Sequence, residues 1–458
     1  MRLFVFSSIR ELDSAPRKFL LFTTFNVISW QCIVGPALVL FARKIDMPAS
    51  WVGFLISFMP LSMVFVLGTT PLVTWLGSKR LMFTTWMLRN LIAGVVFLMP
   101  WAVAHCGTRA AWYVLLGATL GFCLMRAAGA GAWFPWLHEV VPENQRGAYF
   151  SAEASVAQMV NIGVILGQGL LLRGDPDVGR FLIIYAVGIV AGLVSLIWMY
   201  RVPGGDSVDE GLTWQESYSA YRAAFSDRAF LWFVVTAALC FSCTSWLGSA
   251  LVLYMRDALG LSSRTIMILM AAGSVGVLLT IRHWARFAEH SGSGATIFLS
   301  LSGHSIIALT FLVLAPGVPG TFYALGPVLV LGTIFGGAQW MAAHRAMLNY
   351  VKTSARVGYT NLWTVGTALT MGITPILAGQ IIDAWGLWGF RTCFLIAGLA
   401  GFLCALASRT VVRDGAAADA LERKLRAPAP VITLAKIIGI TLGIHKSNRR
   451  QIPQRVEG

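Results

Sequence analysis

Two arginines lie inside long apolar runs, where an ionised side chain is costly. Arg89 and Arg126 each occupy the middle of such a run. If these runs cross a bilayer, an arginine near its centre costs about 2.5–3.5 kcal/mol on insertion scales, so neither is expected to face lipid. The planar guanidinium of Arg126 offers a fork of donors that fits a carboxylate or phosphate. The alternative is structural: backbone carbonyls and neighbouring polar side chains hold the charge.

Further polar side chains are interleaved with indoles in the apolar runs. Asn26 and Trp30 are four residues apart and therefore share one face of a helix. Polar groups mixed with aromatic rings suit an organic solute whose apolar faces stack while its hydroxyls are hydrogen-bonded. The alternative is that tryptophans anchor helices at the membrane interface. The candidate substrate-binding residues are Asn26, Trp30, Gln31, Arg126, Trp133, Gln158, Asn161, Thr244, Gln339 and Trp340.

Groups that could carry a proton are scarce in these runs. The central parts of the runs hold no Asp or Glu, and His304 is the group there whose ordinary pKa lies near neutrality. Glu139 and Glu153 lie near one edge of the runs and Asp383 near the opposite edge. These four residues are the candidates for ion coupling, although a lone histidine inside a run more often satisfies a polar contact.

The composition is that of an integral membrane protein. The chain is 57% hydrophobic and 12% charged, and a soluble domain shows about twice that charged fraction. A spanning helix needs about 20 mostly apolar residues. The first such run lacks a cleavage site and is predicted to be an uncleaved span. Runs of this kind lie near 19–42, 51–76, 81–103, 111–136, 150–172, 181–201, 229–254, 264–286, 295–315, 321–343, 357–382 and 390–408.

The stretch Gly35–Arg43 returns in the second half of the chain as Gly248–Arg256. A second copy at this fidelity indicates two similar halves in tandem. The sequence therefore predicts an all-α membrane protein with twelve transmembrane helices in two six-helix bundles. Further landmarks recur at nearly the same separation: Arg89 with His304, Pro100 with Pro316, Arg146 and Tyr149 with Arg356 and Tyr359, and residues 179–181 with 389–391.

The net charge of +15 could suggest nucleic acid, but the basic residues gather in alternate loops, as the positive-inside rule describes. This bias excludes nucleic acid as the leading partner and places both termini in the cytoplasm of a multi-pass protein of the cell inner membrane. In the tail, residues 431–450 predict an interfacial helix, with disorder as the alternative. The predicted segments are 1–18 (cytoplasmic), 19–201 (first bundle), 202–228 (linker with a short helix near 214–225), 229–408 (second bundle) and 409–458 (basic tail).

The cysteines give no disulfide framework, because six of the seven lie in apolar runs. Cys240 and Cys243 have the spacing of a redox motif but no partner motif, so they are interpreted as small helix-packing residues. The sequence contains neither His-Glu-x-x-His nor Gly-x-Ser-x-Gly, which disfavours a membrane enzyme. We expect no metal and no cofactor.

A chain of two six-span halves with a central linker resembles the major facilitator superfamily. In the loop after the second span, Leu72, Gly77 and Lys79 match the family's pattern, whereas Thr74 replaces its acid. Arg126 with its small neighbours is similar to the family's fourth span. Gln168 replaces the proline of the antiporter motif, which removes most support for drug antiport. The conformational latch implied by the resemblance comprises Gly77, Lys79, Arg146, Glu289 and Arg356.

The resemblance implies a monomeric secondary transporter, without enzymatic activity, whose halves rock about a central site to expose it to each side in turn. The partners would be a small-molecule substrate, membrane lipids, and protons or a counter-solute in symport or antiport. The fork of Arg126 favours an organic anion, and a sugar or other neutral polyol is the alternative. A non-transporting receptor or scaffold of the same fold also stays open.

Overall fold

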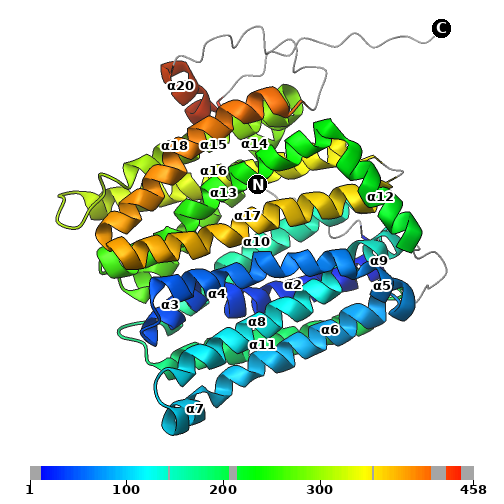
Figure 1. The fold of residues 1–458 in the computed structure, drawn as a ribbon, viewed down its shortest axis with the longest axis horizontal. Helices are drawn as coiled ribbons and strands as arrows, with labels where there is room; N and C mark the ends of the chain where they lie inside the picture. Colours follow the sequence, from blue (N-terminus) through cyan, green and yellow to red (C-terminus); the bar gives the residue numbers. More distant parts are fainter. Residues whose placement is uncertain (1–11, 143–144, 206–213, 353–354, 414–429, 445–458) are drawn as a thin grey trace.

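The computed structural model describes residues 12–142, 145–205, 214–352, 355–413 and 430–444. Within these residues every regular element is a helix, and twelve helices are long and apolar enough to cross a membrane. The predicted all-α architecture is confirmed (Figure 1). The helices extend past several of the apolar runs, because a 30-residue helix is about 45 Å long and outreaches a hydrocarbon core of about 30 Å.

The first half holds six spans, three of them built from consecutive helical segments. Short helices α5 (Thr70–Leu76) and α9 (Trp133–Val140) extend the second and fourth spans. The spans are α2 (Ser14–Val34) with α3 (Pro36–Lys44), α4 (Ala49–Ser62) with η1 (Met63–Gly68), α6 (Ser78–Ala93) with η2 (Gly94–Leu98) and α7 (Met99–Cys106), α8 (Ala110–Ala130), α10 (Arg146–Leu171) and α11 (Val178–Tyr200).

The second half repeats this plan after the linker helix α12 (Trp214–Ser226), which lies where the sequence predicted one. A helix in the tail, α20 (Pro430–Thr441), packs against α14 and α15; the basic residues after 444 lie outside the described part. The spans are α13 (Arg228–Leu253) with η4 (Tyr254–Ala258), α14 (Ser263–Ser291), α15 (Ser293–Thr310), α16 (Thr321–Tyr350), α17 (Arg356–Trp385) and α18 (Leu387–Val411).

The most extensive contacts between the two halves are those of α4 with α17 and of α10 with α14. Figure 1 shows the blue and cyan half beside the green to orange half, with α4, α10 and α17 where they meet. Small residues allow close backbone approach there. A Cβ on Gly53 would lie 2.0 Å from the carbonyl oxygen of Pro375, and one on Gly379 would lie 2.3 Å from that of Ala49.

The internal repeat is visible in matching helix positions. Arg146 and Arg356 are the first residues of α10 and α17. Gly77 and Gly292, with φ of 78° and 83°, precede α6 and α15, so Arg89 and His304 follow the start of their helices by the same number of residues. Positive φ favours glycine at both turns.

The repeat fails at two landmarks. Gly35 separates α2 from α3 because Pro36, which has no N–H, begins the new helix, whereas Gly248 lies inside the continuous α13, where Ser249 follows it. Pro100 is part of α7, but Pro316 lies in the turn after α15 because the ninth span ends at Thr310. These two landmarks match in sequence and differ in structure.

The two ends of the bundle carry different segments. The Arg43 end, on the left of Figure 1, holds α3, the start of α4, η4 and the end of α17. The linker end, on the right, holds α5, α9 and α12.

Candidate functional site

Arg126 lies near the middle of the fourth span, on α8 before its continuation into α9. The side chain is partly exposed, and its Nη1 lies 4.0 Å from Sδ of Met63 on the second span. Among the described residues no carboxylate forms an ion pair with Arg126. The charge therefore has no counter-charge in the part of the chain that the structure describes.

The small residues after Arg126 serve helix packing. A Cβ on Gly129 would lie 2.1 Å from Oγ1 of Thr85, and one on Gly131 would lie 2.2 Å from Oγ1 of Thr69. These glycines let the third and second spans approach the fourth, so the space beside them is already filled by neighbouring helices.

Arg89 is held by protein groups, as the structural alternative expected. Its side chain is fully buried, and Nη2 donates to Oδ1 of Asn26 at 2.5 Å. The guanidinium lies 4.5 Å from the ring centre of Trp86 and 4.9 Å from that of Phe122. Asn26 accepts a second hydrogen bond from Nε1 of Trp86 at 3.0 Å. The side-chain carbonyl of Asn26 thus already accepts two hydrogen bonds. The sequence did not predict the contacts of Arg89 with the two aromatic rings.

Several other candidates of the first half lie at helix contacts. Nε1 of Trp30 is buried and has no hydrogen-bond partner among the described residues. Gln31 is 3% exposed, and its backbone oxygen accepts from Nε2 of Gln168 at 3.2 Å. Trp133 stacks on Phe19 of the first span, with ring centres 4.7 Å apart.

The fifth span contributes a link between the halves. Nδ2 of Asn161 donates to Oγ of Ser274 on α14 at 3.4 Å, while Oδ1 of Asn161 is buried without a described partner. Gln158, about one turn earlier on α10, is partly exposed. Both residues therefore lie on the helix that contacts the opposite half.

In the second half, an aromatic cluster joins three spans. Trp340 of α16 lies 5.2 Å from Phe241 of α13 and 4.4 Å from His344, and His344 lies 4.6 Å from Trp363 of α17, measured between ring centres. The side chain of Trp340 is 49% exposed, and the buried Nε1 of Trp363 has no described partner. The cluster thus contains a partly exposed indole, that of Trp340, and a buried donor without a described partner, Nε1 of Trp363.

The remaining second-half candidates are less accessible. Gln339 is 1% exposed, and neither polar atom of its side chain has a described partner. Thr244 is satisfied within its own helix, where Oγ1 donates to the carbonyl of Phe241 at 2.9 Å. The structure does not bring Gln339 and Thr244 into a hydrogen-bonded contact with Arg126.

The structure separates the four coupling candidates. His304 is 6% exposed between α15 and α16, with Nδ1 3.4 Å from the carbonyl oxygen of Gly332. Glu139 accepts from the backbone N–H of Gly205 at 2.8 Å, and Asp383 accepts from those of Ala49 and Ser50. Glu153 is partly exposed and accepts from Oγ1 of Thr23 at 3.3 Å.

The residues of the implied latch do not contact one another in the described structure. Nζ of Lys79 donates to the carbonyl of Val202 at 2.7 Å, at the start of the linker. Glu289 and Arg356 are exposed. The side chain of Arg146 lies outside the described part, as does that of Thr74. The latch stays a prediction for another conformation.

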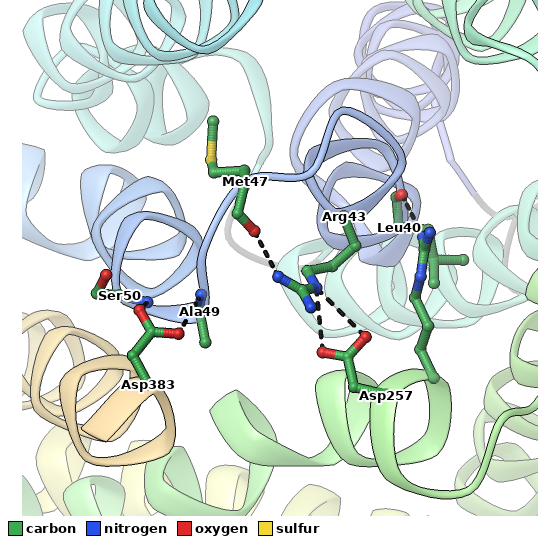
Figure 2. A network of polar contacts seen from close by, with 8 residues as sticks. Leu40, Arg43, Met47, Ala49, Ser50, Asp257 and Asp383 are labelled. Atoms are coloured by element: carbon green, nitrogen blue, oxygen red, sulfur yellow. Dashed lines mark hydrogen bonds and ion pairs between the residues drawn. The ribbon is translucent and has the colours of Figure 1, made fainter. Parts of the chain in front are cut away.

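A polar network closes the Arg43 end, and sequence reasoning missed it. Nε of Arg43 lies 3.0 Å from a carboxylate oxygen of Asp257 on the opposite half, while Nη1 donates to the carbonyl of Met47 (Figure 2). Asp383 accepts from the first two N–H groups of α4 at 2.9 and 2.7 Å, which caps a helix of the other half (Figure 2).

A second cross-half bond runs the opposite way, from Nη1 of Arg256 to the carbonyl of Leu40 at 2.7 Å. At the linker end, the described contacts instead fix each end of the linker to one half. Trp136 and Glu139 hold Pro203 and Gly205, whereas Asn361 donates to Tyr221 of α12. The cross-half polar contacts that the structure describes thus lie at the Arg43 end and mid-span.

Solved structures that are similar to this chain include transporters. Residues 236–442 match the family model described as Major Facilitator Superfamily. No curated protein matches the sequence. Among solved structures, a D-xylose-proton symporter matches with a TM-score of 0.66 at 12% identity, covering 87% of this chain and 98% of that chain.

Two other solved structures are similar to the chain. The nucleoside transporter NupG has a TM-score of 0.62 at 14% identity, covering 86% of this chain and 97% of that one. A bacterial homologue of the iron transporter ferroportin, in an outward-facing state, has a TM-score of 0.62 at 14% identity and covers 87% and 99%. The structural likeness establishes the fold over both halves, and the family match covers the second. The chain is thus a multi-pass membrane protein with the fold of these transporters, and its second half matches the Major Facilitator Superfamily model.

Proposed function

We propose that the protein is a secondary transporter that moves a small organic anion by alternating access. The observation that carries the proposal is the unmatched charge of Arg126 in the middle of the fourth span. A cation inside a membrane span without a partner is costly, so a carboxylate or phosphate on the solute would supply the missing charge. The guanidinium fork would hold either group through paired hydrogen bonds.

The aromatic cluster supports an organic solute with an apolar face. By the repeat, Trp340 corresponds to Trp133, which follows Arg126 by seven residues, or about 10 Å along a helix. An exposed indole at that level could stack on the apolar part of an anion held at Arg126. A neutral sugar would use the same indole and the unsatisfied donors of Trp30 and Trp363, which makes it the alternative outcome of the test.

The test is uptake into proteoliposomes of labelled benzoate, pyruvate, glycerol 3-phosphate and glucose. We expect at least one anion to enter faster than glucose, and we expect Arg126→Ala and Arg126→Lys to lose most of that uptake, because Lys keeps the charge but not the fork. Arg109→Ala, at an exposed arginine just before α8, is the matched control and should transport at the parental rate. Parental uptake by Arg126→Ala, or selective uptake of glucose, would overturn the anion proposal.

We further propose that the linker end faces the cytoplasm and that the Arg43 end faces outward, as the positive-inside bias indicates. On this orientation the structure is closed toward the outside. Cys106, exposed at the end of α7, should react with a membrane-impermeant maleimide on intact cells. A cysteine at Ser207 in a Cys106→Ser background should not react, and labelling there would reverse the topology.

A further inference from the structure

The carboxylate of Glu153, in the fifth span, has no ion-pair partner among the described residues. Glu153 lies in the span Ala152–Leu171, and among the described residues no cation forms an ion pair with it. Its hydrogen bond comes from the hydroxyl of Thr23 on α2 at 3.3 Å. The residue Glu153 is partly exposed in this conformation.

A phenol lies one helical turn away from this carboxylate. Tyr149 is fully buried, and its hydroxyl has no hydrogen-bond partner among the described residues. A buried phenol without a partner is costly, so this hydroxyl is available as a donor to a group that comes within reach. Thr23, Tyr149 and Glu153 form a cluster at the contact of α2 and α10, which we name the Glu153 cluster.

No described charged group on the helices packed against α10 forms an ion pair with Glu153. Helices α2 and α14 pack against α10. None of their titratable residues in the described part forms an ion pair with Glu153: Arg17 and Lys18 on α2, and Arg264, Arg282, His283, Arg286, Glu289 and His290 on α14. Among the described contacts, the hydrogen bond from the hydroxyl of Thr23 is thus the one that stabilises the carboxylate.

The other carboxylates near the spans differ from Glu153, because each accepts hydrogen bonds from backbone N–H groups or forms an ion pair. Protonating Asp383 would weaken two bonds from the start of α4, and protonating Glu139 would weaken its bond from Gly205. Asp257 is paired with Arg43. A proton at Glu153 removes no ion pair, and it converts the group into an acid that can be dehydrated at lower cost.

We propose that Glu153 is the proton-binding site that couples the proposed anion transport to a proton gradient. The carboxylate takes a proton from water to become a neutral acid, and releases it to water on the other side. The proposal rests on the proposed function for the identity of the solute. Its physical basis is solvation: a carboxylate must stay hydrated while the linker end is open, whereas the neutral acid can be enclosed when that end closes.

The position of Glu153 connects it to both halves. Helix α10 contacts α2 of its own half and α14 of the other, where Asn161 bonds to Ser274. A change of charge on α10 therefore acts where the halves move against each other. Closure of the linker end should accordingly become more favourable as pH falls. One coupled proton changes the closed-to-open ratio by up to about tenfold per pH unit.

The test measures linker-end closure without any solute. Spin labels are placed on the exposed positions Trp75 and Leu348, one in each half, in a cysteine-free background in lipid bilayers. We expect the parental protein to shift toward the shorter inter-label distance between pH 8 and pH 5. Glu153→Gln, which mimics the neutral acid, should show the shorter distance at both pH values. Asp177→Asn, at a 75% exposed carboxylate just before α11, is the matched control and should keep the parental shift.

Two outcomes would overturn the proposal: a Glu153→Gln protein that keeps the parental pH shift, or a parental protein whose distances do not change with pH. Glu153→Asp, which keeps an ionisable carboxyl, should retain a pH-dependent shift and thereby separates titration from a packing defect. The label distances do not involve Arg126 or any solute. Failure here would leave the uptake test of the anion proposal unaffected, and failure of that test would leave the proton site standing.

Discussion

Arg43 and Arg256 end the two copies of the internal repeat, and each reaches into the opposite half of the protein. Arg43 pairs with Asp257 at 3.0 Å, next in sequence to Arg256, while Arg256 donates to the carbonyl of Leu40 at 2.7 Å. The two contacts are reciprocal, as expected for interfaces related by pseudo-twofold symmetry. The duplicated sequence therefore supplies both sides of the closure at the Arg43 end.

Charge reversal at this closure should open the Arg43 end. Arg43 and Asp257 are 26% and 22% exposed, so their pairing contributes on the order of 1 kcal/mol. Arg43→Asp or Asp257→Arg alone should raise the population open at that end by about fivefold or more, because each places like charges together. The readout is the labelling rate of a cysteine at the buried Ser57 in a Cys106→Ser background.

The double variant Arg43→Asp with Asp257→Arg restores opposite charges and should return the labelling rate toward the parental value. Equal labelling in all four proteins would show that the pair does not hold the closure. Rescue by the double variant distinguishes an ion pair from a general loss of packing.

A methyl group at Gly53 should also weaken the seam between the halves. The added Cβ would lie 2.0 Å from the carbonyl oxygen of Pro375, which backbone atoms cannot relieve without separating α4 from α17. We expect Gly53→Ala to lower the apparent Tm in detergent, with a cost of about 1–3 kcal/mol. Gly163→Ala is the matched control, since a Cβ there meets nothing within 4 Å. Equal Tm values for the two variants would contradict the close approach of α4 and α17.

The sequence predicts the spans and the repeat because both depend on local patterns. Apolar runs of spanning length mark the twelve helices, and Arg146 and Arg356 begin equivalent helices as the repeat requires. The break at Gly35 without one at Gly248 follows from a single proline, which the second copy of the repeat lacks.

The candidate site was less predictable because its partners are distant in sequence. Arg43 and Asp257 are 214 residues apart, so their pairing depends on how the halves dock. In the sequence, the feature that points to this contact is the arginine that ends each copy of the internal repeat. Arg89 and Arg126 looked alike in sequence, and the structure separates them: Asn26 and two rings surround the first, while the second has no described counter-charge.

Asp227 should give the protein a distinct stability change in acid. Its carboxylate lies 2.7 Å from Nζ of Lys352 and accepts from the hydroxyl of Tyr359 and the N–H of Phe230. The hydrogen bond from Lys352, with those from Phe230 and Tyr359, lowers the pKa of Asp227. Because the folded-state pKa is depressed, the stabilisation is complete above the ordinary value of about 4 and is lost as pH falls through the folded value.

Asp227→Asn keeps a capping oxygen and removes the charge. We expect its apparent Tm to be below the parental value at pH 7, and the difference to shrink as pH is lowered toward 2, because protonation of Asp227 removes its charge. Glu289→Gln, at an exposed carboxylate, is the comparison and should track the parent at both pH values. A Tm difference for Asp227→Asn that is the same at pH 7 and pH 2 would show that its charge contributes nothing.

Asn26 should prove to be a stability residue through its contact with Arg89. Asn26→Ala would leave the buried guanidinium with no acceptor for Nη2, while Nε and Nη1 already lack described partners. Removing one partner of a buried charged hydrogen bond costs about 1–3 kcal/mol, so the apparent Tm should fall clearly. Adding Arg89→Met should recover much of the loss, because it removes the stranded charge. Arg126→Met should leave Tm near the parental value while uptake is lost, since no described carboxylate pairs with that arginine. An Asn26→Ala protein with parental Tm and reduced uptake would instead place Asn26 among the solute-binding groups.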